Sequence, residues 1–589
     1  MTSISQTVLT NVLPAGFPAM LGCAASRLLG LSEVDRTYEA LRAFEDSRPL
    51  PARLLEFMQV TCKATSTDLS HIPRKGPAVL VANHPFGILE AAVLVTAVRQ
   101  IRPDVRVLAN QLLSSVPELQ DLVIPLDVLH TSPRANLAGV RRALQFLNVG
   151  GLLIVFPAGA VSHFDWHARA SVDPPWNRSI ARLIGLAGKN CKPPVVVPVY
   201  VPGSNSAMFH AAGMLHPGLR TALLARELLN KKCTAVELRV GRPVPFEKLS
   251  AMSSDEERIQ YLRWRTYVLA NRKAFKANTR LLRRWKGEPR AEEVIPPVAP
   301  AILAREIETV PARCLLDRSG DLSVYLAEAP DIPHVLREIG RLREVTFRQA
   351  GEGTGRAVDV DRFDAHYLHL FVWNAAKQEI VGAYRLQATE STPNLYTQTL
   401  FHFDERFLNA MGPAVELGRS FIRAEYQKGF APLLLLWKGI GKFIAANPRY
   451  KILFGPVSIS NQYQAVSREL MIAFLEQRAG ISEWMGLVNA RHAPPARPAG
   501  VLCSDVEELS DVISDLEPTQ AGIPVLLRQY LKLGGRLLSF NVDPEFSNAL
   551  DGLIVVNLTK TEPKLLERYL GKAEAASFLD FQKELIHGT

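Results

Sequence analysis

The chain has 589 residues, with 68 Lys and Arg against 58 Asp and Glu, and 47% of its residues are hydrophobic. At about 100–200 residues per domain, this length predicts two to four domains, and the composition excludes a disordered or fibrous chain. The net charge of +10 is unevenly placed: residues 1–300 carry 37 basic and 23 acidic side chains, whereas residues 301–589 carry 31 and 35. The basic half favours an anionic partner, either a nucleic acid or a membrane surface.

The N-terminal residues 1–60 are predicted to form a helical region. Its segment Val8–Leu31 is apolar but interrupted by Pro14 and Pro18, and no charge precedes Arg27, so it lacks the basic start of a signal peptide. Two interpretations stay open: a shallow membrane-docking element, or a helix packed on the next domain. The six cysteines are scattered without a CxxC pair, so neither a disulfide framework nor a zinc site is expected, and a reducing compartment fits.

Short apolar runs alternate with helical stretches between residues 77 and 245. Continuous β-branched runs are typical of strands buried on both faces, and intervening helices such as 90–99 and 136–147 indicate an α/β layered domain. The predicted strands are 78–82, 105–108, 152–156, 195–201 and 235–240.

Two motifs in this region carry chemistry. His84 follows a predicted buried strand, in a turn marked by Pro85 and Gly87, and Glu90 opens the next helix. An imidazole can take a proton from a hydroxyl at neutral pH, and a carboxylate on its other nitrogen fixes the tautomer. A second turn, Phe156–Ser162, ends another strand and can present backbone N–H groups to an oxyanion.

These motifs resemble those of the glycerolipid acyltransferases, NHxxxxD and FPEGxxS, and the likeness covers about residues 60–250. The resemblance implies a glycerolipid-acyltransferase-like α/β domain over 61–286, with His84 as general base and Glu90 as its orienting acid. Glu90 stands one residue later than the family's acid, and Ala158 replaces the family's Glu. The implied substrate-binding residues are Asn83, Gly87, Phe156, Pro157, Gly159 and Ser162.

Residues 256–286 are predicted to form a basic amphipathic helix. Arg258–Lys286 holds ten basic residues and no acid, and apolar residues recur at helical spacing from Tyr261 to Leu269. This pattern suits an anionic bilayer surface. The alternative is a helix packed on the domain; nucleic acid is not expected, because no binding motif accompanies the charge. The Pro-rich residues 287–304 are predicted to be a linker.

The second half contains four short polar pieces in order. An Arg with a Phe four residues later, Arg343 and Phe347, lies in the predicted helix 332–347. Asp361 and Asp364 follow in a loop; Arg385 lies on the predicted strand 380–388. Glu416 and Arg419 complete the set near another strand. Guanidinium groups pair bidentately with carboxylates, and a carboxylate can take a proton from an amine.

The four pieces together resemble the acyl-homoserine-lactone synthases and the related ornithine N-acyltransferases, which are GNAT-like. The resemblance implies a GNAT-like α/β domain over 305–589, with Glu416 as base. Arg343, Arg385 and Arg419 would bind the carboxylate of an amino acid and order the Asp pair. Residues 426–432 do not fit the usual acetyl-CoA loop, which favours acyl carrier protein as donor over acyl-CoA. No metal or resident cofactor is expected in either half.

With both domains on one chain, the sequence resembles the bifunctional ornithine-lipid synthases. This resemblance implies N-acylation of ornithine with a 3-hydroxyacyl chain, followed by O-acylation of the new 3-hydroxyl. The expected partners are acyl carrier protein and a membrane lipid surface, at the cytoplasmic face of the inner membrane as a peripheral protein. Two alternatives remain: a glycerolipid acyltransferase carrying a regulatory GNAT-like module, and a secreted pore-former, which the absence of a signal peptide disfavours.

Overall fold

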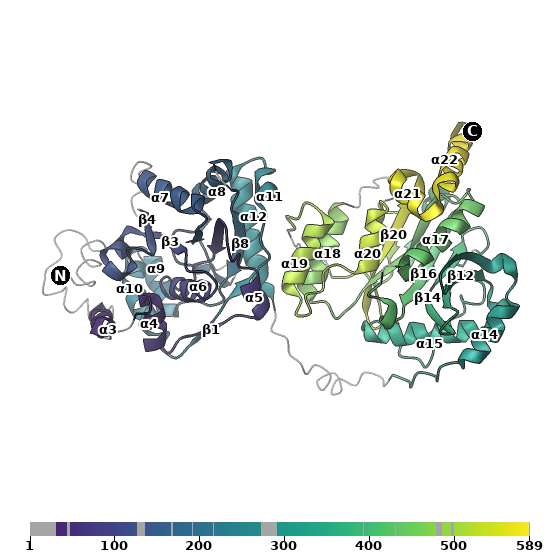
Figure 1. Ribbon diagram of the computed structural model, residues 1–589, viewed down its shortest axis with the longest axis horizontal. Coiled ribbons are helices and arrows are strands. Elements are labelled where there is room, and N and C mark those ends of the chain that lie inside the picture. Colours follow the sequence, from purple (N-terminus) through teal and green to yellow (C-terminus); the bar gives the residue numbers. More distant parts are fainter. Residues whose placement is uncertain are drawn as a thin grey trace. The chain divides into compact units, whose positions relative to one another are not determined.

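The computed structural model describes residues 31–43, 47–126, 136–165, 169–190, 192–215, 217–272, 291–392, 394–429, 431–478, 484, 486–495 and 500–587. The chain divides into two compact units, Met1–Lys273 and Ala274–Thr589 (Figure 1). Each unit combines helices with a central sheet, which confirms the α/β class. Most of the apolar segment 8–31 lies outside the described residues, and no described helix has the length and apolar character needed to cross a membrane.

The first unit is built on a six-stranded sheet in the order β10-β8-β2-β5-β3-β4. The strands are β2 (Ala78–Ala82), β3 (Val105–Asn110), β4 (Val123–Leu126), β5 (Leu152–Val155), β8 (Val195–Tyr200) and the antiparallel β10 (Arg239–Val240). Every residue of β2 is buried, because this central strand is covered on both faces.

Alternation along β2 explains the layers of this unit. Leu80 faces a core that includes α6 (Leu89–Arg99), whereas Val79 and Val81 face a core that includes α8 (Arg178–Asn190) and α12 (Asp255–Val268) (Figure 1). The helix α7 (Leu137–Asn148) packs in the second core through Ala143 and Leu147. The sheet therefore lies between two helical layers, and its parallel strands all point their carboxyl ends to one edge.

Helix α12 is the described part of the predicted bilayer-binding helix, and its apolar face is occupied. Tyr261 and Leu262 are buried in the core beside α8. The Arg258 guanidinium binds Asp255, and that of Arg272 binds Asp68 at 2.5 Å. The described half of the segment therefore packs on the domain, which was the alternative interpretation, and residues 273–286 lie outside the described residues.

The second unit contains an eight-stranded sheet in the order β11-β12-β13-β14-β16-β17-β20-β19. Its strands are Leu315–Ser319, Leu322–Ala327, Leu368–Asn374, Glu379–Ala388, Ala414–Ile422, Ile452–Ile459, Ala549–Asn557 and Arg536–Asp543, in that spatial order. The pairing is antiparallel except between β16 and β17. Helix α15 (Pro333–Gln349) packs on one face, and α17 (Ala431–Ala446) packs on the other against β12 and β13.

The predicted linker 287–304 contributes to the second unit over much of its length. The N–H groups of Glu292 and Ile295 donate to the carbonyls of Gly355 and Ala357. Helix α14 (Pro300–Thr309) begins inside the predicted linker and buries Leu303. A proline at the first helical position tolerates the loss of its N–H, so a Pro-rich run can start a helix as well as prevent one.

Candidate active sites

The first candidate site lies at the carboxyl end of β2. Asn83 follows the strand and is buried; its side-chain amide donates to the carbonyl of Val201 at 2.9 Å and accepts from the Val201 N–H at 2.7 Å. This pair of hydrogen bonds holds the end of β2 against the chain that leaves β8. Asn83 therefore has a positioning role, because it fixes the place from which the His84 side chain projects.

His84 and Glu90 meet as the sequence predicted. The His84 Nδ1 lies 2.8 Å from Glu90 Oε1, and the N–H groups of Phe86 and Gly87 donate to the same oxygen at 3.0 and 2.9 Å. Burial alone would raise the pKa of Glu90, but the neighbouring His84 and these hydrogen bonds outweigh it and lower that pKa. A charged Glu90 thus holds Nδ1 and leaves Nε2 of the partly exposed imidazole to meet a substrate.

The second motif contacts His84 directly through Phe156 and indirectly through Asp173, a residue that the sequence did not indicate. The ring of Phe156 stacks on His84 with centroids 4.4 Å apart. The buried carboxylate of Asp173 accepts the His84 N–H at 3.1 Å and the Ser162 hydroxyl at 2.5 Å. Trp176 donates to its other oxygen at 2.9 Å. Ser162 therefore helps to hold the second loop in place. Asp173 could not be predicted, because an acid before two prolines is a pattern typical only of a turn.

Gly159 turns the second loop with a positive φ of 65°, but its own N–H is engaged. It donates to the carbonyl of Phe156 at 3.0 Å inside the turn. The amides of Ala160 and Val161 come next and make no hydrogen bond among the described residues. Donors for an oxyanion in this loop are therefore to be sought one or two residues after Gly159.

Gly87 should not tolerate a side chain. Its φ is +105°, and a Cβ would lie 2.9 Å from Leu224 Cδ2. Gly87→Ala should therefore displace the turn that donates to Glu90, cost roughly 1–3 kcal/mol, and lower transfer by the first unit by up to about 100-fold. Gly76→Ala is the matched control, because Gly76 has a φ of +85° and an open surrounding. Equal activity of the two variants in an acyl-transfer assay would contradict this expectation.

The spacing of His163 and His167 would suit two metal ligands on a helix, but the structure does not place His163 on a helix. His163 begins the short strand β6 (His163–Asp165), which is not helical, and His167 lies outside the described residues. Within the part of the chain that the structure describes, no three His, Cys, Asp or Glu side chains are grouped to hold a metal ion.

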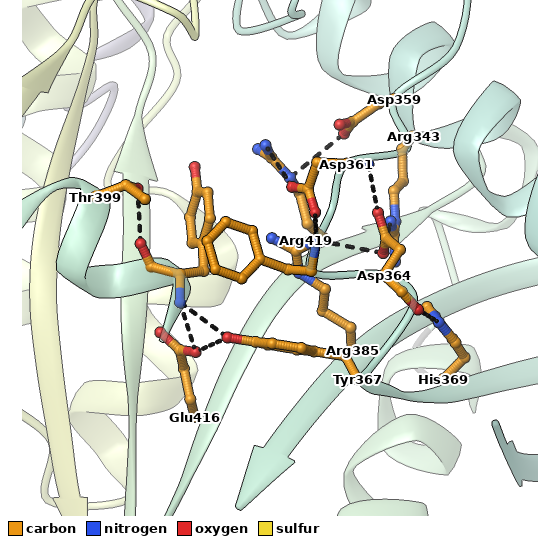
Figure 2. A network of polar contacts seen from close by, with 12 residues as sticks. Arg343, Asp359, Asp361, Asp364, Tyr367, His369, Arg385, Thr399, Glu416 and Arg419 are labelled. Atoms are coloured by element: carbon orange, nitrogen blue, oxygen red, sulfur yellow. Dashed lines mark hydrogen bonds and ion pairs between the residues drawn. The ribbon is translucent and has the colours of Figure 1, made fainter. Parts of the chain in front are cut away.

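The second candidate site brings the four polar pieces together on the α15 face of the eight-stranded sheet (Figure 2). Arg343 Nη1 lies 2.7 Å from Asp364 Oδ1, and Arg385 Nη1 lies 2.8 Å from Asp361 Oδ1. Both guanidinium groups are completely buried. Burial would raise the pKa of Asp364, but Arg343 and Arg385 together lower it well below its ordinary value. These charges form a neutralised network inside the domain.

Arg419 reaches this network from a β-bulge. Arg385 of β14 pairs with Gly418 of β16, but Ala383 pairs with Phe421, so β16 contains one extra residue between the two pairs. Arg419 lies in that bulge in a left-handed conformation with a φ of 49°. Such strain in a non-glycine residue is typical of functional positions.

The guanidinium of Arg419 lies between two aromatic rings and beside loosely placed acids. It lies 4.9 Å from the ring centroid of Tyr396 and 4.8 Å from that of Phe546. Its nitrogens lie 3.5 Å from Asp359 and 3.7 Å from Asp361. Phe347 packs edge-to-face on Phe546 and so holds in place one of the two rings that contact Arg419. Of the three predicted arginines, Arg419 alone keeps part of its side chain exposed.

Glu416, the predicted base, is 1% exposed and fully engaged. Its carboxylate accepts hydrogen bonds from the Tyr367 hydroxyl and from the N–H groups of Tyr396 and Thr397, the latter at 2.7 Å. Figure 2 shows Tyr367 extending from the Arg–Asp network to Glu416. The geometry thus gives Glu416 a clear role in holding the turn that carries Tyr396, and connects it to the site through Tyr367.

Comparison with known proteins finds a family match in each half of the chain. Residues 24–275 match the family model described as "Acyltransferase", and residues 342–438 match the one described as "Acetyltransferase (GNAT) domain". These two matches fall in different units of the structure and contain the two candidate sites.

The curated relatives include enzymes of both kinds. The chain is 37% identical over 203 residues to a glycine N(alpha)-acyltransferase of Bacteroides thetaiotaomicron, covering 32% of this chain and 60% of that relative. It is 26% identical over 278 residues to an L-ornithine N(alpha)-acyltransferase of Rhizobium meliloti, covering 45% and 90%. It is 23% identical over 222 residues to a lyso-glycine lipid O-acyltransferase of Phocaeicola vulgatus, covering 36% and 75%.

The matched length limits what these names transfer. The chain spans about three fifths of the two glycine N(alpha)-acyltransferases that it matches. What both family models and all of these relatives share is acyl transfer. Residues 24–275 are therefore similar to an acyltransferase domain, and residues 342–438 are similar to a GNAT-type domain.

Proposed function

We propose that this protein makes a diacylated amino-acid lipid in two steps, one in each unit. The GNAT-type domain would attach a 3-hydroxyacyl chain to the α-amine of an amino acid, ornithine by the resemblance, and the first unit would acylate the 3-hydroxyl. The observation that carries this proposal is the presence of two separate sites of different chemistry, a His–Glu pair and an Arg–Asp network. The names of the relatives, which cover both N- and O-acylation, support it.

In the O-acyl step, His84 acts as general base. Its Nε2 takes the proton of the 3-hydroxyl while that oxygen attacks the carbonyl carbon of an acyl thioester. Glu90 on Nδ1 stabilises the imidazolium, and the amides of Ala160 and Val161 stabilise the oxyanion. Collapse of the tetrahedral intermediate breaks the C–S bond, and the leaving thiolate receives the proton from His84.

In the N-acyl step, Arg419 binds the carboxylate of the amino acid. Arg343 and Arg385 are committed to the buried Asp pair, whereas Arg419 has acids only at 3.5 Å or more. The α-amine attacks the thioester carbon and loses a proton. We assign that proton to Glu416 through the Tyr367 hydroxyl, which gives its own proton to Glu416 as it accepts one. The thiolate of acyl carrier protein leaves and takes up the proton returned from Glu416 through Tyr367, with acyl-CoA as the alternative donor.

Expression in a host that lacks aminolipids tests this function. Lipid extracts analysed by mass spectrometry should contain new monoacyl and diacyl amino-acid lipids whose headgroup fragment identifies the amino acid. Extracts without any new aminolipid would refute the proposal. A diacyl glycerolipid product that persists in Arg419→Gln would instead favour a glycerolipid acyltransferase with a regulatory GNAT-type module.

A further inference from the structure

Three buried carboxylates near Arg419 take no part in the chemistry described above. Asp551 of β20 pairs directly with Ser458 of β17 and with Asn541 of β19, so these three side chains share one face of the sheet. Asp543 lies two residues beyond Asn541 on the same face. Glu352, from the loop after α15, accepts the Ser458 hydroxyl at 2.7 Å. We call Glu352, Asp543 and Asp551 the carboxylate triad.

The triad has no cation of its own. Arg343, Arg385 and Arg419 balance the three acids Asp359, Asp361 and Asp364, and among the described residues no ion pair involves a triad carboxylate. The three triad residues are only 5–7% exposed. A buried charge without a partner is costly, so full ionisation of the triad requires a cation that the described chain does not supply.

Two polar groups at this place, one of the triad and one beside it, have no hydrogen-bond partner among the described residues. The Asp551 carboxylate makes no hydrogen bond within the described part of the chain, although the residue is 5% exposed. The Asn541 Nδ2, on the neighbouring strand, is completely buried and likewise has no hydrogen-bond partner. Burial and the nearby carboxylates raise the pKa of Asp551 well above its ordinary value, and burial raises the pKa of Asp543 and Glu352. A strand of this kind would be more stable with an apolar residue at 551.

We infer that the carboxylate triad is the subsite for the side-chain ammonium of a cationic amino acid. The inference rests on the proposed N-acylation, because that function places the amino acid's carboxylate on Arg419. Phe546 connects the two places: its ring centroid lies 4.8 Å from the Arg419 guanidinium, and its N–H donates to the carbonyl of Asp543. A substrate held on Arg419 therefore has the triad beside it.

Charge balance then selects the class of amino acid. A zwitterion such as glycine brings no cation to the three carboxyl groups of the triad, whereas a diamino acid such as ornithine or lysine brings a second ammonium that favours their ionised forms. The names of the relatives include both glycine and ornithine enzymes and leave the choice open. The triad favours the diamino acid, because its second ammonium can bind Asp551 and Asp543 where glycine has no atoms.

Ornithine and norvaline form a matched pair of probes, because norvaline has the same carbon skeleton without the side-chain amine. Their binding to the full-length protein can be measured by calorimetry, with and without a 3-hydroxyacyl carrier protein, and their N-acylation by product analysis. The wild type should bind ornithine more tightly than norvaline. Asp551→Asn should lower ornithine affinity by about 10- to 100-fold, the range for a hydrogen bond between charged groups, and leave norvaline binding unchanged.

Two controls separate recognition from folding. Glu545→Gln removes an exposed acid from the turn beside Asp543 and should leave the binding of both ligands unchanged. The melting temperature of Asp551→Asn should equal or exceed that of the wild type, because a buried acid without a partner is replaced by a neutral amide of the same shape. Asp543→Asn provides a second variant with the same expected selectivity loss if Asp551→Asn does not fold.

The outcomes distinguish the subsite from the proposed function. Equal binding of ornithine and norvaline by the wild type, or equal losses for both in the variants, would overturn the subsite. Selective ornithine binding that depends on Asp551 but yields no N-acyl product would support the subsite and refute the N-acylation.

Discussion

Replacing His84 by alanine should stop the O-acyl transfer and leave the N-acyl transfer intact, so that cells accumulate the monoacyl lipid. The His84 imidazole is partly exposed and is oriented by the carboxylate of Glu90, which lies 2.8 Å from its Nδ1. Loss of a general base lowers a rate by about 100- to 10,000-fold. The rate of O-acylation of a purified monoacyl lipid measures the effect directly.

Two companion variants sharpen that test. Glu90→Gln keeps the shape of the acid but removes its charge, so it should reduce the same step while leaving some activity. His402→Ala replaces an exposed histidine on β15 (Phe401–Phe403) and should behave as the wild type. Co-expression of His84→Ala with Arg419→Gln should restore the diacyl lipid, because each chain retains one working site. Diacyl product from His84→Ala alone would show that another group is the base.

Asp364→Asn should destabilise the second unit more than any single surface change. It leaves Arg343 and Arg385, both completely buried, without the carboxylate that they share. Removing one partner of a buried ion pair costs about 3–5 kcal/mol. Peptide-resolved hydrogen exchange of the full chain should show faster exchange throughout residues 291–587 and unchanged exchange in residues 47–272.

A matched substitution and the pH dependence check this origin. Asp404→Asn removes a carboxylate that pairs with Arg406 at the surface and should leave hydrogen exchange nearly unchanged. The folded structure lowers the pKa of Asp364, so its contribution to stability is present above the ordinary aspartate value of 3.8 and is lost as the pH falls through the lower folded value. Similar exchange in both variants would contradict a structural role for the buried network.

Sequence patterns predicted the elements that bury continuous apolar runs. The strand 78–82 has the predicted limits, because its periodicity is local. The His84–Glu90 contact was also predicted, since only a short turn separates the two residues. The roles of Asp173 and Asp551 were not predicted, because His84 lies 89 residues from Asp173, and the Arg419 site lies on a different strand from Asp551. Asp551 did leave one signal, a lone acid in the otherwise apolar strand Ala549–Asn557.

Other features depend on tertiary context that a sequence pattern does not contain. The amphipathic pattern of α12 is the same for a helix that faces lipid and one that packs on α8, and only the fold decides between them. The donors on Glu416 come from Tyr367 and from the turn at 396–397, which no spacing rule connects to it. The sequence therefore predicted which residues gather, but not which of them remain available to a substrate.

The bulge at Arg419 makes this strand sensitive to changes in chain length. Glu416 and Arg419 are three residues apart, an odd number that would send them to opposite faces of a regular strand. The extra residue in the bulge lets the Glu416 and Arg419 side chains lie on the same face of the sheet. It also returns Phe421 to the core beside α15. Deleting a single residue between 417 and 420 would abolish the bulge in which Arg419 lies, whereas point substitutions there would not. Natural relatives should therefore vary in residue type across this stretch far more readily than in length.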